Sequence, residues 1–361
     1  MTRGLSQLDY GRKLWASYSS MPWLQHPSFT VRKEIISQVT PQFVELAGSQ
    51  ERLKFDYLVL AMGVSRQAPM GVSASTKDEF IKELERDHAA IASAKSIAIV
   101  GGGAVGTELA ADLKTNFPEK NVTLVHSRNL PVPGPFMEEF RQGAADILRK
   151  LGVRTLFGQR VVNEIPADTC LEPEAPEFSD ILPELVDSVK RNVTIETASG
   201  EKIKADLVFN CLGAKTKAPI VNFPSSTDEP MFTPNGIRVK SSLQLDDPKY
   251  PHIFAVGDIS NRLQAKFAGA AVYDGRVAGE NIARLIDAAS IVEGSAAELV
   301  EYQLPDVSMC LVLGEKHALI QGNGHVVPSE EAVKMCPPDI KLGMVMQDNY
   351  IGTYPVAMQT F

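Results

Sequence analysis

The sequence is poor in cysteine and in long apolar runs. Its 361 residues include four cysteines, Cys170, Cys211, Cys310 and Cys336, and none of them forms a C-x-x-C pair. This excludes a relay between two neighbouring thiols and favours a reducing compartment, so we expect four inert structural cysteines. No run of about 18 apolar residues occurs, and we therefore predict no transmembrane helix. The first residues carry no apolar signal segment, which favours the cytoplasm and leaves peripheral membrane association open.

Positive charge is also scarce. Lys and Arg number 36 against 44 Asp and Glu, giving a formal charge of −8. No cluster of Lys and Arg suggests a nucleic-acid surface, so a DNA-associated role is disfavoured. From Glu164 to Asp187 the chain contains no Lys or Arg and several prolines, and we predict a solvated surface excursion. We predict no metal site.

A glycine-rich motif is the clearest positive signal. The short apolar run Ser96–Val100 leads into Gly101-Gly-Gly-Ala-Val-Gly106, after which apolar residues recur at helical spacing. A second apolar run, Asn121–Val125, completes a strand–turn–helix–strand unit. In such a unit Gly101 permits the tight turn, Gly103 lets a pyrophosphate approach the backbone, and Gly106 lets helix and strand pack closely. The sequence therefore predicts a dinucleotide site at the helix N-terminus.

The residues after the second strand bear on the choice of nucleotide. An acid normally stands there and accepts hydrogen bonds from the adenosine ribose. This chain has His126-Ser127-Arg128 instead. Without a carboxylate to repel a 2′-phosphate, and with Arg128 nearby, NADPH or mixed use is favoured. The alternative is a solvated Arg128 and a His126 that only ends the strand.

Further runs indicate the rest of the framework. Phe55–Gly63 and Ala205–Gly213 each place an Asp before an apolar run that ends in Gly, a weak internal repeat that suggests two similar nucleotide domains. Ile253–Asp258 is a strand with an acidic end, and an acid at that edge faces ligands in open α/β sheets. Other expected elements are helices over Met137–Leu151 and Ala268–Leu285, strands over Val153–Val162, Val193–Thr197, Met309–Leu313, Ala318–Gln321 and Gly343–Met346, and a turn at Ser199–Gly200.

Together these motifs resemble one family. The order and spacing of Ile97–Leu113, Val122–Ser127, Cys211–Gly213 and Phe254–Asp258 are similar to those of the pyridine-nucleotide-dependent flavoprotein reductases, specifically the apoptosis-inducing-factor-like, ferroptosis-suppressor branch with its fungal relatives. The similarity covers roughly residues 11–325. In that family an NAD(P)H domain is inserted within an FAD domain, and the flavin passes electrons to a quinone or a similar small-molecule acceptor.

The resemblance implies a role for particular residues. Gly101, Gly103, Gly106 and Glu108 would bind NAD(P)H, together with His126 and Arg128 at the end of the second strand. On the FAD side it implies contacts from Ile36, Gly63, Gly257, Asp258, Lys266 and Phe267: the backbone of Ile36 near the adenine, Gly257 and Asp258 near the ribityl and pyrophosphate groups, and Lys266 and Phe267 near the isoalloxazine. No catalytic side chain is compelling.

The expected fold class is α/β, with two Rossmann-like three-layer nucleotide-binding domains and a small C-terminal α+β cap. The expected boundaries are a partial FAD-binding domain over 1–93, an NAD(P)H-binding domain over 94–213, a return to the FAD-binding domain over 214–300, and the cap over 301–361.

The sequence departs from the family pattern in one respect, and this departure leaves more than one explanation open. The family begins with its own strand–GxGxxG–helix–strand unit for FAD, and residues 1–35 resemble the stretch that follows that unit. Loss of those contacts would weaken FAD binding by roughly a thousandfold or more. Three explanations remain open: a truncated sequence of a complete FAD-dependent NAD(P)H oxidoreductase, a flavin-free NAD(P)H-binding protein without redox activity, and a decayed or purely binding protein.

Overall fold

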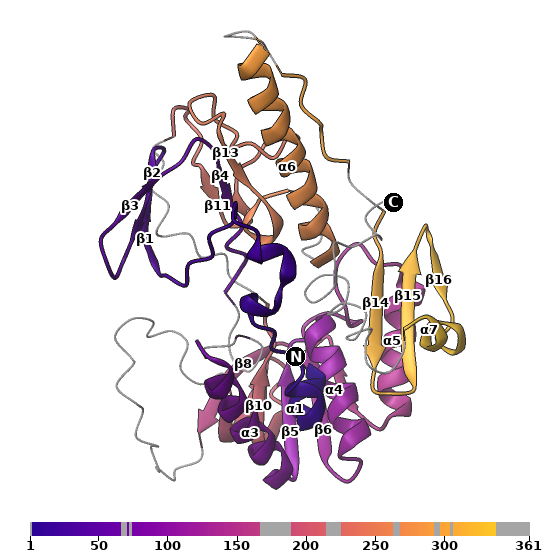
Figure 1. The fold of residues 1–361 in the computed structure, drawn as a ribbon. Coiled ribbons are helices and arrows are strands. Elements are labelled where there is room, and N and C mark those ends of the chain that lie inside the picture. Colours follow the sequence, from indigo (N-terminus) through magenta and orange to yellow (C-terminus); the bar gives the residue numbers. More distant parts are fainter. Residues whose placement is uncertain are drawn as a thin grey trace. The chain divides into compact units, whose positions relative to one another are not determined.

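A computed structural model describes residues 2–65, 71, 74–166, 189–213, 225–262, 268–291, 297–303 and 306–336. The chain forms two compact units, each with its own core (Figure 1). Unit 1 comprises residues 1–31, 66–213 and 306–361, and unit 2 comprises residues 32–65 and 214–305. This division differs from the expected boundaries, because residues 1–31 and 66–93 group with the glycine motif, as does the C-terminal segment.

A six-stranded sheet is the centre of unit 1. Its order is β7-β6-β5-β10-β9-β8, with β7, β6, β5 and β10 parallel and β9 and β8 added as antiparallel strands. The bounds are β5 Ser96–Val100, β6 Asn121–His126, β7 Arg154–Phe157, β8 Val161–Pro166, β9 Val189–Thr197 and β10 Lys202–Asn210. The central strand β5 is apolar from Ile97 to Val100 and buried over those four residues, as expected of a strand covered on both faces.

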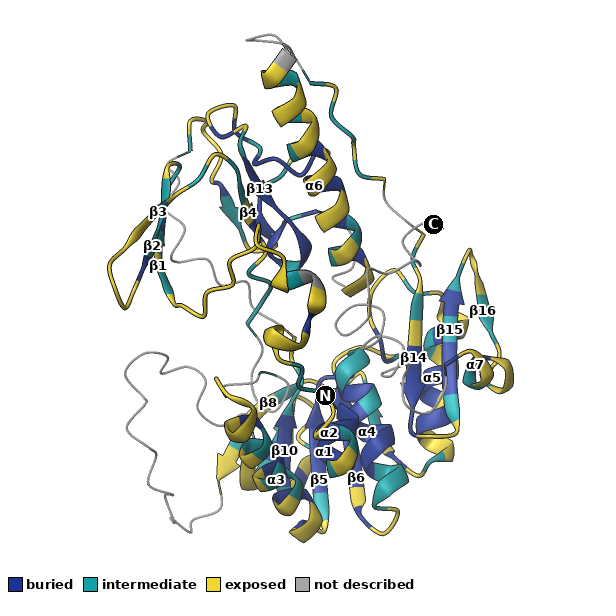
Figure 2. Cartoon of the chain, in the orientation of Figure 1, coloured by how far each residue is buried: buried dark blue, intermediate teal, exposed yellow. Residues whose placement is uncertain are grey.

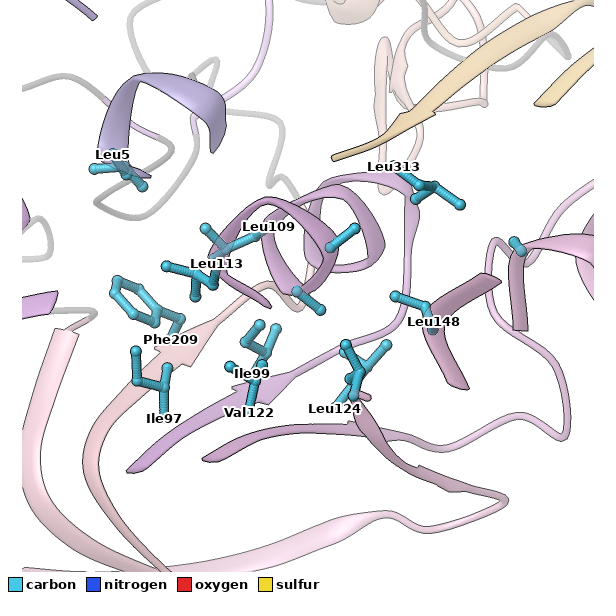
Figure 3. Close-up of a cluster of buried hydrophobic side chains, with 14 of the residues drawn as sticks. Leu5, Ile97, Ile99, Leu109, Leu113, Val122, Leu124, Leu148, Phe209 and Leu313 are labelled. Atoms are coloured by element: carbon cyan, nitrogen blue, oxygen red, sulfur yellow. The ribbon is translucent and has the colours of Figure 1, made fainter. Parts of the chain in front are cut away.

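Helices supply the main core of unit 1. They are α1 (Thr2–Ser6), α2 (Leu8–Gly11), α3 (Lys77–Ser93), α4 (Ala104–Asn116) and α5 (Glu138–Lys150). Leu109 and Leu113 lie four residues apart on one face of α4 and are fully buried. They belong to one apolar cluster with Ile99 and Phe209 of the sheet (Figure 3). Figure 2 shows the buried and exposed sides of these helices, and the exposed residues of α5 are all polar: Glu138, Glu139, Gln142, Asp146, Arg149 and Lys150.

A small antiparallel sheet completes unit 1. It has the order β14-β15-β16, with β14 at Met309–Leu313, β15 at His317–Gly322 and β16 at His325–Val327, and α7 (Ser329–Met335) packs on it. Leu311, Leu313 and Leu319 extend the core cluster of the large sheet.

Two of the four cysteines are paired with each other, which the sequence did not predict. Cys310 on β14 and Cys336 at the end of α7 form a disulfide, because the packing of α7 on the small sheet brings together positions 26 residues apart. Cys211 is a free thiol whose pKa burial raises to about 12, which keeps it protonated. Cys170 lies outside the described residues.

The described part of unit 2 contains three small sheets and one long helix. A meander of β1 (Ile36–Val39), β2 (Phe43–Leu46) and β3 (Arg52–Lys54) accompanies a parallel pair, β4 (Leu58–Leu60) with β13 (Ile253–Ala255). The others are β11 (Phe232–Thr233), β12 (Gly236–Ile237) and the helix α6 (Ala268–Ile291). Two 3-10 turns lie in unit 1, at Tyr18–Ser20 and Pro22–Gln25, and one in unit 2, at Gly257–Ile259. Phe254, Val277 and Ala278 join β13 to α6 in one buried cluster.

The α/β fold class is confirmed, with one clear error in the elements. The single strand expected over Val153–Val162 is two strands, β7 and β8, at opposite edges of the sheet. Gly158 between them has φ +70°, a conformation that ends the first strand. The strand expected at Gly343–Met346 and the excursion's residues 167–188 lie outside the described residues. No helix among the described residues is long and apolar enough to span a bilayer.

Candidate functional site

The glycine loop after β5 is the first candidate site. The N–H of Gly101 donates to Val125 O at 2.8 Å, which continues the pairing with β6, and Gly101 has φ +109°. A Cβ on Gly106 would overlap the carbonyl oxygen of Gly101. Neither Gly101 nor Gly106 can therefore carry a side chain. A Cβ on Gly103 would meet no atom within 4 Å. The backbone is therefore closely packed behind the loop and open beside Gly103.

The first turn of α4 is suited to an anion. Gly103 is the N-cap of α4, and it offers no side chain to accept the first helical N–H groups. Such groups, together with the helix dipole, favour a phosphate or carboxylate. The predicted roles of Gly101, Gly103 and Gly106 all concern this one loop, and the structure places the three residues together.

Glu108 lies one turn further along α4. Burial and, to a smaller degree, the charge of Asp112 raise the pKa of its carboxyl group, a hydrogen bond from the backbone of Val312 lowers it, and the resulting pKa is about 7. Glu108 is therefore a carboxyl group that titrates near neutral pH within four residues of the glycine loop. Groups with such a pKa are common in functional sites, although buried structural clusters also contain them.

Two residues that the sequence did not indicate hold α4 in place. Arg3 of α1 lies 3.1 Å from Asp112 Oδ1, and both side chains are 1% exposed. Arg3 also donates to Gly314 O at 2.6 Å, beyond the end of β14. Asp112 stands beside buried Leu113 on the helix. A charged residue within an apolar stripe indicates a buried partner, but it does not say which residue that partner is.

His126 ends β6 and contacts the glycine loop. The N–H of Gly102 donates to His126 Nδ1 at 3.0 Å, and Gly102 O accepts from Val132 N at 2.7 Å. Burial lowers the pKa of His126, and the charges of Arg128 and Arg141 lower it further. A neutral ring that accepts at Nδ1 carries its proton on Nε2. Among the described residues this Nε2 is buried and has no hydrogen-bond partner, so its N–H is an unsatisfied donor.

Arg128 is exposed two residues after His126. The pair lies at the carboxyl end of the parallel strands, the edge at which open α/β sheets bind ligands.

The second candidate site is the Gly257–Ile259 turn of unit 2. It follows β13, whose parallel partner β4 is followed by Gly63, and the two glycines have φ +68° and +63°. A Cβ on Gly63 would meet no atom within 4 Å. Asp258 is half-buried within the turn. Gly63 and Asp258 therefore each lie three residues beyond the carboxyl end of one of two adjacent parallel strands.

The backbone N–H of Gly257 is already engaged. It donates to Asp274 Oδ2 of α6 at 2.9 Å. The expected contact of Gly257 with a pyrophosphate can therefore not come from this amide, because a buried carboxylate accepts it. Ile36 begins β1 and packs against the core of unit 2. Lys266 and Phe267 lie outside the described residues.

Comparison with known proteins gives a consistent result. The profile of a family described as pyridine nucleotide-disulphide oxidoreductase matches residues 27–275. The chain is 28% identical over 337 residues to oxidoreductase OXR1 of Ajellomyces capsulatus, covering 91% of this chain and 68% of that protein. It is 28% identical over 325 residues to ferroptosis suppressor protein 1 of Xenopus laevis (90% and 78%), and 27% identical over 340 residues to apoptosis-inducing factor homolog A of Dictyostelium discoideum (90% and 76%).

Solved structures show the same fold. A water-forming NADH oxidase from Lactobacillus brevis, bound to NADH, matches with a TM-score of 0.62 at 19% identity, covering 93% of this chain and 68% of that one. A ferredoxin reductase from Rhodopseudomonas palustris matches with a TM-score of 0.60 at 17% identity (88% and 71%). At these identities the likeness concerns the fold alone, and it agrees with two Rossmann-like domains.

Proposed function

Because the chain belongs to the pyridine nucleotide-disulphide oxidoreductase family, we propose that it is an FAD-dependent NAD(P)H oxidoreductase that passes electrons to a quinone-like or other small-molecule acceptor. The observation that carries the proposal is the glycine loop, with its closed back and its open side at Gly103.

Unit 1 would bind the nicotinamide nucleotide. The loop from Gly101 to Gly106 shapes the backbone, and the amides of the first turn of α4 stabilise the diphosphate. Glu108 would lie further along the same helix, on the nicotinamide side of the site.

NADPH is the favoured nucleotide. His126 carries a buried, unsatisfied Nε2–H where an acid would carry an acceptor, and exposed Arg128 adds a positive charge. A donor and a cation suit the oxygen-rich 2′-phosphate better than a ribose hydroxyl. Titration of His126→Asp and Arg128→Glu with both nucleotides tests this. We expect each variant to lose at least about tenfold in NADPH affinity and to keep its NADH affinity. Equal losses for both nucleotides would contradict the preference.

Unit 2 would bind FAD. Asp258 would accept hydrogen bonds from sugar-like hydroxyl groups, and the space beside Gly63 would admit a ligand close to the backbone. Ile36 would face the adenine side, and Lys266 and Phe267 the isoalloxazine. When bound, the flavin supplies the redox chemistry, namely acceptance of a hydride and release of its electrons to the acceptor. The protein's residues bind and orient the reactants.

The test uses the full chain. Purified protein is incubated with FAD, desalted and examined for flavin absorption, and it is then mixed with NADPH and a ubiquinone analogue. We expect flavin bands that NADPH bleaches and the quinone restores. A colourless protein that FAD cannot reconstitute would overturn the proposal. If the same protein still bound NADPH, the flavin-free nucleotide-binding function would take its place.

A further inference from the structure

A buried ion pair lies directly behind the Gly257–Ile259 turn. Arg262 Nε is 2.5 Å from Asp274 Oδ2, and the two side chains are 2% and 0% exposed. The same carboxylate oxygen accepts the N–H of Gly257. One carboxylate on α6 therefore connects the residue that begins the turn with the arginine three residues after the turn ends.

The N–H of Gly257 does not by itself require a charged acceptor. A neutral acceptor, such as an amide oxygen, would satisfy the N–H of Gly257. A buried carboxylate without a counter-charge costs several kcal/mol, and Arg262 compensates that cost. Burial raises the pKa of Asp274, the N–H of Gly257 and the charge of Arg262 lower it, and the charge of Asp258 raises it again. Asp274 therefore lies close enough to Asp258 for the two carboxylates to interact.

Further contacts fix the turn around Asp258. Ser260 Oγ donates to Gly257 O at 2.8 Å. A Cβ on Gly257 would lie 3.1 Å from Ala271 Cβ, so the turn packs closely on α6. Asp258 follows Gly257 in the turn, so one hydrogen bond and one peptide unit connect Asp274 to Asp258.

We propose that Asp274 and Arg262 are positioning residues, whose ion pair sets the Gly257–Ile259 turn and so holds Asp258 in place to accept hydrogen bonds from the hydroxyl groups of the ribityl chain of FAD. The inference rests on the proposed function. Because Arg262 cancels the charge of Asp274, the pair supports the turn without adding a second net negative charge beside the phosphates of the ligand.

Three double variants of the full chain test the inference. Arg262→Met with Asp274→Leu removes the ion pair and the acceptor for Gly257 while keeping similar volume, a replacement that proteins often tolerate. Arg262→Gln with Asp274→Asn keeps polar partners without charge. Arg3→Met with Asp112→Leu is the matched control, because it replaces the buried pair of unit 1. Each protein is titrated with FAD by fluorescence quenching, the visible circular dichroism of bound flavin is recorded, and NADPH affinity is measured in parallel.

We expect the Met/Leu pair at 262 and 274 to weaken FAD binding at least tenfold and to change the flavin dichroism, with NADPH affinity within twofold of wild type. The Gln/Asn pair should restore FAD affinity to within about threefold, and the control should leave it within twofold. Unchanged FAD affinity in a folded Met/Leu protein would overturn the inference alone, as would an equal loss in the control. A wild-type chain that takes up no FAD would overturn the proposed function and this inference with it.

If the Met/Leu protein does not fold, Asp274→Asn is measured in the same way. A raised FAD dissociation constant with altered dichroism then supports the positioning role, and wild-type values overturn it.

Discussion

In each unit a glycine with a positive φ follows a parallel strand, but the contacts that hold this glycine in place differ between the units. In unit 1 the N–H of Gly101 is met by Val125 of the neighbouring strand, and the loop is closed by contact between Gly106 and backbone. In unit 2 the N–H of Gly257 is met by Asp274, a charged side chain from a helix. A broad sheet supplies backbone partners, whereas the turn of unit 2 depends on side chains. Four predictions test this contrast.

The largest effect is expected from Gly106→Ala, because the new Cβ would overlap the carbonyl oxygen of Gly101. We expect unit 1 to lose about 3–5 kcal/mol of stability and NADPH binding to disappear. Gly103→Ala is the matched control: its Cβ meets open space, so stability should change by less than about 1 kcal/mol while nucleotide affinity falls. Urea denaturation followed by tryptophan fluorescence reports on unit 1, since Trp15 and Trp23 both lie there. Equal stabilities for the two variants would contradict the close packing.

A comparable loss is expected from Arg3→Met, which leaves the carboxylate of Asp112 buried without its counter-charge. Breaking such a pair costs about 3–5 kcal/mol. Arg12→Met provides the comparison, because Arg12 pairs with Glu85 at 2.7 Å on the surface and its loss should leave the unfolding midpoint close to that of the wild type. If tryptophan-monitored unfolding gave the same midpoint for both variants, the buried pair would not be a major support of α4.

A smaller effect should appear as a pH dependence of stability. The pKa of Glu108 is raised from 4.5 to about 7 in the folded protein, so the folded state binds its proton more tightly than the unfolded state does. Stability from this group is present below about pH 4.5 and is lost as the pH rises through about 7. Because Glu108 is partly accessible, we expect a loss of about 1–3 kcal/mol. Glu108→Gln should flatten this part of the pH profile, and an unchanged slope would contradict the assignment.

The smallest effect is expected from Ser260→Ala, which removes the buried hydrogen bond to Gly257 O. We expect a loss of about 1 kcal/mol from unit 2, together with faster hydrogen exchange at the Gly257 amide. Ser37→Ala, whose hydrogen bond to Glu45 O is exposed, should change neither quantity measurably. Unchanged exchange at Gly257 in the Ser260 variant would show that the turn does not depend on this side chain.

Most of the glycine loop could be predicted from the sequence, but the long-range contacts that support the loop could not. The strand, glycine turn and helix around Gly101 were recognisable because residues close in the chain form them. The pairs Arg3–Asp112 and Cys310–Cys336 were not, since helix and sheet packing joins positions far apart in sequence. The role of Asp274 was also missed: a lone Asp in a helical stretch does not reveal which amide it accepts.

By itself the sequence determined the α/β class, the glycine loop and the positions of His126 and Asp258 at strand ends, because periodicity and glycine conformation are local properties of the chain. The tertiary structure decided how those positions are used. It turned the ring of His126 into a donor by placing the N–H of Gly102 on Nδ1, and it engaged the amide of Gly257 with the carboxylate of Asp274. Hydrogen bonds between distant segments fix protonation and orientation, and only folding brings those segments together.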